Sequence, residues 1–328
     1  MKFLRQIIVQ NETFAVSTTR TDDLPVNPLS VVLVTLRMLN NNATVADFSS
    51  INAVLNQIAK LEILYKGSAI ISGSFADLAR LYGVLMRHVP MQTKVSLTDN
   101  DMRTLTVPIL LGRRPYDAAE CFPAVRRGEL QLQMTTAAAQ TGVDTPVVQV
   151  ETVEILEATP QRFLKATTIS RTFPATGDND VDLPIGNKLA GTLLFGTTAP
   201  TGAAVTATIG QLRLLVDNVE SYYARTNWET LHNELSRYYQ ESVAGGAFQA
   251  EEHGAAANAA GDLLKTGEHG QTGFFNNYAY LDFDPLKDDS YLLDTAGHSR
   301  IHLRVNAGVA DAMRAIPVEL VDVAGATS

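Results

Sequence analysis

Histidine side chains offer the clearest potential for metal chemistry in this sequence. A catalytic metal site in a β-barrel needs several imidazoles within about 2 Å of one ion. The six histidines contain no HxH pair: His88, His232, His253, His269, His298 and His302. His298 and His302 are four residues apart, which on a strand places both on one face but too far apart for one ion without a bend. The sequence therefore predicts no metal site.

Two carboxylate pairs stand close together in the second half, at Asp282/Asp284 and at Asp288/Asp289. Paired carboxylates can perform glycoside hydrolysis or bind calcium. Asp282 and Asp284 would share one face of a strand, and the PLKDD sequence after Asp284 is typical of an acidic turn. We expect these carboxylates to be solvated turn charges.

The single cysteine, Cys121, excludes an intrachain disulfide and lacks the local signature of a nucleophile. We expect it to be a small buried side chain. GxSxG and P-loop patterns do not occur, and the Gly- and Ser-rich residues 67–74 lack the lysine of a phosphate loop. No catalytic, cofactor-binding or metal-binding residue is predicted, and we expect no enzymatic activity.

Charge is sparse and unevenly distributed along the 328 residues. Charged residues make up 19% of the chain, below the roughly 25% typical of soluble domains, which favours extensive contacts between subunits. Residues 1–156 carry equal numbers of acidic and basic side chains, so the net charge of −9 lies in residues 157–328. Nucleic-acid binding requires clustered Lys and Arg, so direct nucleic-acid binding is not expected. Residues 1–10 lack the apolar core of a signal peptide, and we expect cytoplasmic synthesis.

Most of the chain consists of short apolar runs with period-two alternation, separated by Gly, Pro, Asn, Asp and Thr. Such runs are typical of half-buried strands. They are residues 29–36, 61–71, 105–111 and 129–134 in the first half, and residues 189–195, 209–216, 278–283 and 301–305 in the second. Their spacing predicts an all-β sandwich or closed barrel with a few helices, rather than alternating βα units.

One helix is predicted in each half. Apolar residues recur at helical spacing from Phe75, and again from Trp228, the only tryptophan. Ser74 and Asn227 stand immediately before these stripes, and both residue types are favoured as N-caps. We expect Phe75 and Trp228 to be buried where each helix packs on its own barrel.

Residues 243–277 differ in composition from the rest of the chain. They are rich in Gly, Ala, Asn, Glu and His, a composition that cannot bury much apolar surface. We expect an exposed loop outside the barrel core, on the outer face or across a neighbouring subunit, with a short helix at residues 255–264.

The two halves of the sequence repeat each other in the same order. The matched segments are DDLPV (22–26) with VDLPI (181–185), KLEILYKG (60–67) with QLRLLVDN (211–218), ELQLQM (129–134) with RIHLRV (300–305), and VQVETVEI (148–155) with IPVELVDV (316–323). The third match extends without a gap back to Leu110 and Leu281, and it aligns Leu130 with Ile301. With the two helices, these matches predict a tandem duplication. We expect domains at residues 1–156 and 157–328, the second containing the 243–277 insertion.

A duplicated β-sandwich with one helix inserted in each copy resembles the double jelly-roll major capsid proteins of tailless icosahedral viruses, including phages with an internal membrane. The features that carry the resemblance are the DLPV and DLPI segments before early strands, LPIGNKLAGTLLF at residues 183–195, the two helices, and the near-terminal pair IHLRV and IPVELVDV. The resemblance covers nearly the whole chain. It implies two tandem eight-stranded jelly-roll barrels.

The resemblance also implies a structural function without catalytic residues. Members of that family form homotrimers with a pseudo-hexagonal outline that tile an icosahedral shell. It implies self-association in the virion, with penton and minor capsid proteins and an underlying lipid membrane as further partners. The alternative that the residues leave open is a carbohydrate-binding or carbohydrate-active β-sandwich protein.

Overall fold

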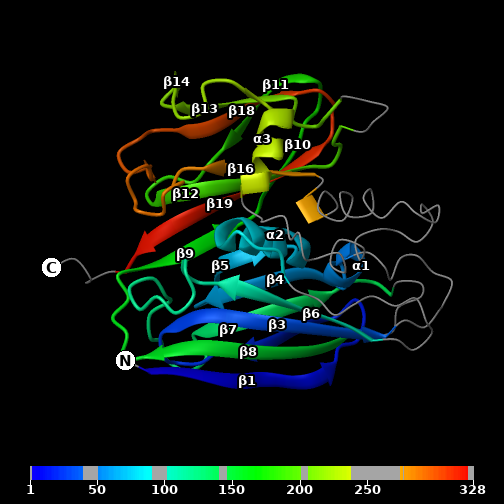
Figure 1. Ribbon diagram of the computed structural model, residues 1–328, viewed down its shortest axis with the longest axis vertical. Helices are drawn as coiled ribbons and strands as arrows, with labels where there is room; N and C mark the ends of the chain where they lie inside the picture. The colour runs from blue at the N-terminus through cyan, green and yellow to red at the C-terminus, as the bar shows by residue number, and fades with distance from the viewer. Residues whose placement is uncertain are drawn as a thin grey trace. The chain divides into compact units, whose positions relative to one another are not determined.

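The computed structural model separates the chain into two compact units (Figure 1). Unit 1 comprises Met1–Phe163, Tyr238–Phe275 and Val323–Ser328, and unit 2 comprises Leu164–Arg237 and Asn276–Asp322. The structure describes residues 2–39, 51–90, 102–139, 146–200, 206–237, 274–275 and 277–323.

Unit 1 is a sandwich of two antiparallel four-stranded sheets. Its strands are β1 (Lys2–Thr13), β2 (Thr19–Asp23), β3 (Leu29–Leu39), β4 (Ile58–Tyr65), β5 (Ser68–Gly73), β6 (Met102–Leu110), β7 (Leu130–Thr136) and β8 (Val147–Leu156). One sheet has the order β1-β8-β3-β6, and the other consists of the four unit 1 strands of a ten-stranded sheet, in the order β2-β7-β4-β5. This order of eight strands is that of a jelly roll.

Unit 2 repeats this arrangement strand for strand. Its corresponding strands are β10 (Ile169–Thr172), β11 (Gly177–Asp182), β12 (Lys188–Gly196), β13 (Gln211–Val216), β14 (Val219–Glu220), β16 (Tyr278–Asp282), β18 (Ile301–Ala307) and β19 (Ala312–Asp322). They pair in the orders β10-β19-β12-β16 and β11-β18-β13-β14. Two short strands, β15 (Thr226–Asn227) and β17 (Leu293–Asp294), add to β13 and β12, and β9 (Arg162–Thr167) contains the passage between the units. The predicted double jelly-roll fold is confirmed.

The equivalence of the two units holds at the level of single hydrogen bonds. Leu130 opens β7 and Ile301 opens β18. The Leu24 amide donates to the Leu130 carbonyl oxygen at 2.9 Å, and the Leu183 amide donates to the Ile301 carbonyl oxygen at 2.8 Å. Leu24 and Leu183 are the leucines of the two DLP segments. The predicted equivalence of Leu130 and Ile301 is therefore confirmed.

The predicted strand at residues 61–71 is in fact a hairpin of β4 and β5. Lys66 and Gly67 separate the two strands with φ angles of 50° and 81°. These positive values are those of a tight two-residue turn, in which glycine carries no steric cost. The apolar pattern continued through the turn because both strands bury the same face of their sheet.

Helices α2 (Phe75–Met86) and α3 (Trp228–Asn233) lie in matching places of the two units. The predicted burial of Phe75 and Trp228 is confirmed, because their exposed fractions are 0% and 2%. Ser74 caps α2 by accepting a hydrogen bond from the Asp77 amide. Asn227 occupies the N-cap position of α3 without making the capping bond, and its side chain instead accepts a hydrogen bond from Gln211. The short helix α1 (Ile51–Leu55) was not predicted, and η2 (Glu234–Arg237) continues the helix predicted from Trp228 as a 3-10 turn.

The predicted domain bounds stay a prediction, and the compact units differ from them. Unit 1 ends its first segment at Phe163 rather than at residue 156, and it includes Tyr238–Phe275. Phe274 and Phe275 are buried, so the expected exposure of the 243–277 segment is wrong for these two residues. Residues 243–273, with the helix expected at 255–264, lie outside the described residues.

Candidate assembly surface

The structure separates the two histidines whose spacing suggested a shared strand. His302 lies in β18 and is fully buried, whereas His298 lies in the loop before β18. The Nδ1 atom of His298 is 2.8 Å from a carboxylate oxygen of Asp217. No group of three metal-ligating side chains forms within the described ranges. The two histidines therefore do not share a strand.

The remaining described histidines have structural surroundings. His232 stacks on Trp228 with ring centroids 5.9 Å apart, and its Nδ1 atom is 2.8 Å from the Tyr278 carbonyl oxygen. His88 contacts the ring of Tyr82 edge-on. His253 and His269 lie outside the described residues.

The acidic turn between β16 and β17 is held by its own carboxylates. Asp282 accepts a hydrogen bond from the Asp284 amide at 2.9 Å, and Asp284 accepts one from the Asp289 amide at 3.2 Å. Asp288 accepts from the Ser290 amide at 3.0 Å. Side chains that accept from amides a few residues ahead are typical of Asx turns. These contacts are those of the turn that the sequence predicted, although Asp284 itself is buried rather than solvated.

Cys121 is fully buried, as the sequence predicted. Burial, together with the charge of Asp117, raises the pKa of its thiol to about 12. A thiol that stays protonated at neutral pH is a poor nucleophile.

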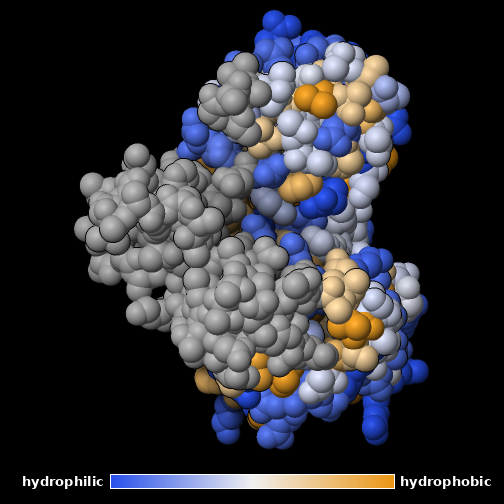
Figure 2. Space-filling view, turned by 90° about the vertical axis from the view of Figure 1, so that its right-hand side faces the viewer, coloured by the Kyte–Doolittle hydropathy of each residue, from blue (hydrophilic) through white to orange (hydrophobic). Residues whose placement is uncertain are grey.

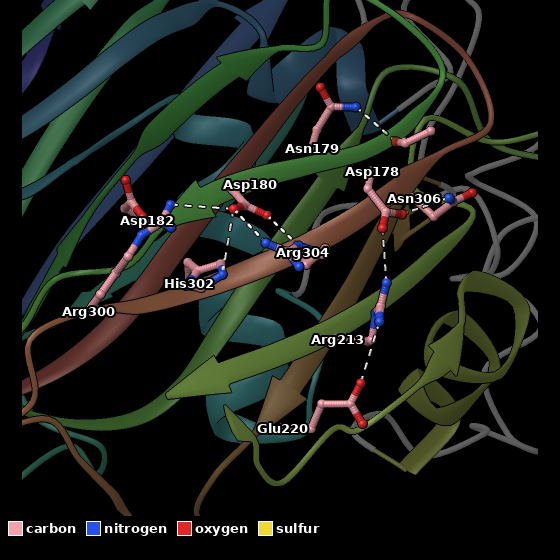
Figure 3. Close-up of polar contacts among 11 residues, drawn as sticks. Asp178, Asn179, Asp180, Asp182, Arg213, Glu220, Arg300, His302, Arg304 and Asn306 are labelled. Carbon is pink, nitrogen blue, oxygen red and sulfur yellow. Dashed lines mark hydrogen bonds and ion pairs between the residues drawn. The ribbon is translucent and has the colours of Figure 1, made fainter. Parts of the chain in front are cut away.

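The outward face of the β11-β18-β13 sheet carries a ladder of charged side chains (Figure 3). On β18, Ile301, Leu303 and Val305 point into the core, so His302 and Arg304 point away from it. The same alternation on β11 sends Val181 inward. Because the side-chain period of a strand is two, each strand contributes one column of polar residues to this face.

The ladder pairs acidic residues of β11 with basic residues of the neighbouring strands. Arg304 binds Asp180 with two parallel hydrogen bonds of 2.8 and 3.0 Å. Arg300, just before β18, donates to Asp182 at 2.7 Å. Arg213 of β13 contacts Asp178 at 3.0 Å. The Arg304 hydrogen bonds hold the pKa of the Asp180 carboxyl below its usual range.

His302 lies beneath this ladder as a buried imidazole. Within the described part of the chain, neither ring nitrogen has a hydrogen-bond partner, and Nε2 is 3.6 Å from Asp180. Burial, and then the positive charge of Arg300, lower the pKa of His302. A neutral imidazole therefore occupies the centre of a charged surface.

On the corresponding face of unit 1, β7 carries two glutamines in place of the histidine and the arginine of β18. Gln131 and Gln133 of β7 occupy the places that His302 and Arg304 occupy on β18, two and four residues into the matched segments. Gln133 donates to the Thr21 hydroxyl and Gln131 donates to Asp23. The two equivalent strands, β7 and β18, thus differ in the charge that they present on the outward face.

The open edge of unit 1 is a second exposed surface, and it carries apolar side chains. Strand β1 is 12 residues long and forms the end of its sheet (Figure 1). Phe3 and Ile7 are 63% and 51% exposed, and the ring of Phe3 packs on that of exposed Tyr116. Its equivalent in unit 2, β10, has four residues and the sequence ISRT. Long apolar edge strands are templates for contacts with other chains.

Apolar surface is dispersed over the face shown in Figure 2, where hydrophobic residues form small patches among polar ones. No helix in the described ranges has both the length and the apolar composition to cross a bilayer.

Comparisons with known proteins find relatives by structure only. No protein-family model matches the chain, and no curated protein matches it by sequence. The major capsid protein of Sulfolobus Turreted Icosahedral Virus is similar, with a TM-score of 0.68, 14% identity, and coverage of 98% of this chain and 97% of that one. The major capsid protein of bacteriophage PM2 gives a TM-score of 0.61, 10% identity and 99% coverage of both chains. A PBCV-1 virus capsid chain gives 0.58, 10% identity, and coverage of 97% and 94%. The chain therefore has the double jelly-roll fold of viral major capsid proteins.

Proposed function

We propose that this chain is a viral major capsid protein, a structural subunit that assembles into an icosahedral shell. The observation that carries the proposal is the repetition of one eight-strand order in two units, in a fold that matches capsid proteins over nearly their full length. Its place is then the virion, after synthesis in the cytoplasm of the host.

A duplicated jelly roll suits a homotrimer. Three chains contribute six similar units, so a ring of threefold symmetry can present a nearly sixfold outline to its neighbours. Such trimers tile a flat lattice, and penton and minor capsid proteins would complete the shell at its vertices. Contacts between trimers add through multivalency, so each can be modest.

A structural role agrees with the surroundings of the reactive side chains. The described histidines, the β16–β17 carboxylates and Cys121 serve turns, stacking and core packing. These roles support a protein that works by association rather than by catalysis. A glycan-binding β-sandwich is the competing expectation, and the next experiment separates the two.

Size-exclusion chromatography with light scattering tests the proposal. We expect a particle of three times the 35.5 kDa chain mass, with a hexagonal outline in electron micrographs. A chain that stays monomeric at every concentration and binds glycans would overturn the proposal.

The exposed β1 edge provides a variant for the same measurement. Ile7→Lys places a charge on the 51% exposed apolar edge, where it should weaken association without disturbing the core. Gln10→Lys is the matched control, because Gln10 is exposed on the same strand and already polar. We expect less association for Ile7→Lys and none of this effect for Gln10→Lys.

A further inference from the structure

An aromatic pair, Phe274–Phe275, is buried in unit 1 although it follows the Gly- and Ala-rich part of the second half. The two side chains are 1% and 2% exposed, and their rings meet edge-on with centroids 4.7 Å apart. Unit 1 contains Tyr238–Phe275, whereas the strands that flank this stretch in sequence belong to unit 2. Two residues from the second half of the sequence are thus buried within unit 1.

Arg80 of α2 holds the backbone of this pair. Its Nε atom donates to the Phe274 carbonyl oxygen at 2.7 Å, and its guanidinium lies 4.5 Å from the centroid of the Phe274 ring. The same side chain donates to Asn52 of α1 and to the Ala76 carbonyl oxygen. Arg80 is only 2% exposed, and a buried charge is retained where hydrogen bonds compensate its lost hydration.

Gly83 of α2 makes room for the two rings. A Cβ atom at Gly83 would lie 3.0 Å from Cζ of Phe275 and 3.2 Å from a ring carbon of Phe274. Glycine is a poor residue for a helix interior, and alanine is the best one. Alanine at this position therefore has two opposite effects: it favours the helix and crowds the docked rings.

The chain is fixed again directly after the pair, in unit 2. The Asn277 side chain donates to the carbonyl oxygens of Gly196 and Thr197 at 2.9 and 2.8 Å. One residue separates Phe275 from Asn277 in the sequence, so the chain passes from unit 1 to unit 2 over a short connection. Displacement of either anchor should therefore pull on the other.

We propose that docking of Phe274 and Phe275 on α2 is a clasp that couples the unfolding of unit 2 to that of unit 1. Trp228 lies in unit 2, is the only tryptophan and is buried, so its emission reports the unfolding of unit 2 alone. Loosening the clasp from the side of unit 1 should therefore be visible at Trp228. The proposal does not depend on a capsid role, because trimer formation is measured separately.

Urea unfolding followed by Trp228 emission tests the docking. Gly83→Ala should lower the midpoint when the aromatic pair is present. It should leave the midpoint unchanged or raise it in a Phe274→Ala/Phe275→Ala background, where the rings no longer clash. The same Gly83→Ala shift in both backgrounds would overturn the proposal. If the double alanine variant does not fold, Phe275→Leu replaces it, since leucine lacks the ring atom nearest Gly83.

A core substitution in unit 1 tests the coupling. Leu132 of β7 is fully buried in unit 1, so Leu132→Ala destabilises that unit whether or not the clasp is present. We expect it to lower the Trp228 midpoint with the aromatic pair in place and to lower it less once the pair is removed. An equal shift in both backgrounds would mean that another part of the chain transmits the coupling, and the proposal would fail.

Discussion

Two side chains at equivalent positions, Gln131 and His302, show how far the copies have diverged residue by residue. Each stands one residue into its strand, on the outward face of the equivalent sheet. Gln131 donates a hydrogen bond to Asp23, whereas His302 has no hydrogen-bond partner within the described residues. An amide stays neutral at every physiological pH, but an imidazole can gain a charge.

His302 should make the second unit sensitive to mild acid. Because its pKa is lowered in the folded state, the unfolded chain binds a proton first as the pH falls through about 6.5. The neutral His302 imidazole therefore leaves the stability of the folded state undiminished above pH 6.5, and that stability falls as the pH drops below this value. We expect His302→Gln to lose less stability than the wild type between pH 7.5 and 5, measured by urea unfolding at Trp228.

His298→Gln is the matched control for that measurement, because His298 is partly exposed and lies beside Asp217 in the preceding loop. This variant should lose as much stability as the wild type between pH 7.5 and 5, because it retains His302. Equal acid sensitivity in the wild type and in His302→Gln would contradict the assignment of this loss to the buried imidazole.

Elements rather than single residues carried most of what the sequence could predict. Strands such as β7 were recognisable because Leu130, Leu132 and Met134 alternate with glutamines, which is the pattern of one buried face. Strands β2 and β11 were not, because edge strands such as TRTDD and GDNDVD have little apolar alternation to detect. The charge ladder was hidden for another reason: Asp180 and Arg304 are 124 residues apart, and only the fold brings them together.

The clasp was missed because composition was averaged over a long segment. The Gly- and Ala-rich composition of residues 243–277 predicted exposure, and the average over this segment included the two adjacent phenylalanines near its end. Two neighbouring large aromatic side chains before a strand are a local signal of burial. The position of the partner helix α2, nearly 200 residues earlier, could not be read from the sequence.

The two helices should respond differently to loss of their N-cap residues. Ser74→Ala removes the hydrogen bond to the Asp77 amide and should cost about 1 kcal/mol. Asn227→Ala removes no capping bond and should cost less, because the Asn227 side chain contacts Gln211 instead. Denaturant unfolding of both variants checks this difference. Equal costs would show that the residue type, rather than the bond observed, sets the stability of the helix start.

For the molecule as a whole, charge should control how readily proposed trimers associate. The net charge of −9 lies in residues 157–328, so approaching particles repel through the second half of the chain. The Debye length falls from about 30 Å at 0.01 M salt to about 8 Å at 0.15 M, which screens this repulsion. We expect light scattering of purified trimers to rise with salt. Scattering that stays flat or falls would rule out charge repulsion as the control, while the trimer itself would remain.

The burial of Cys121 makes the molecule open to selective labelling. Its thiol is buried and protonated at neutral pH, so alkylating reagents should not modify it in the folded protein. A cysteine introduced at Val219, which is 68% exposed, would then be the single reactive thiol of each chain. Every dye, gold particle or peptide attached there would occupy one known site per subunit, so an assembled particle could be decorated at a defined stoichiometry.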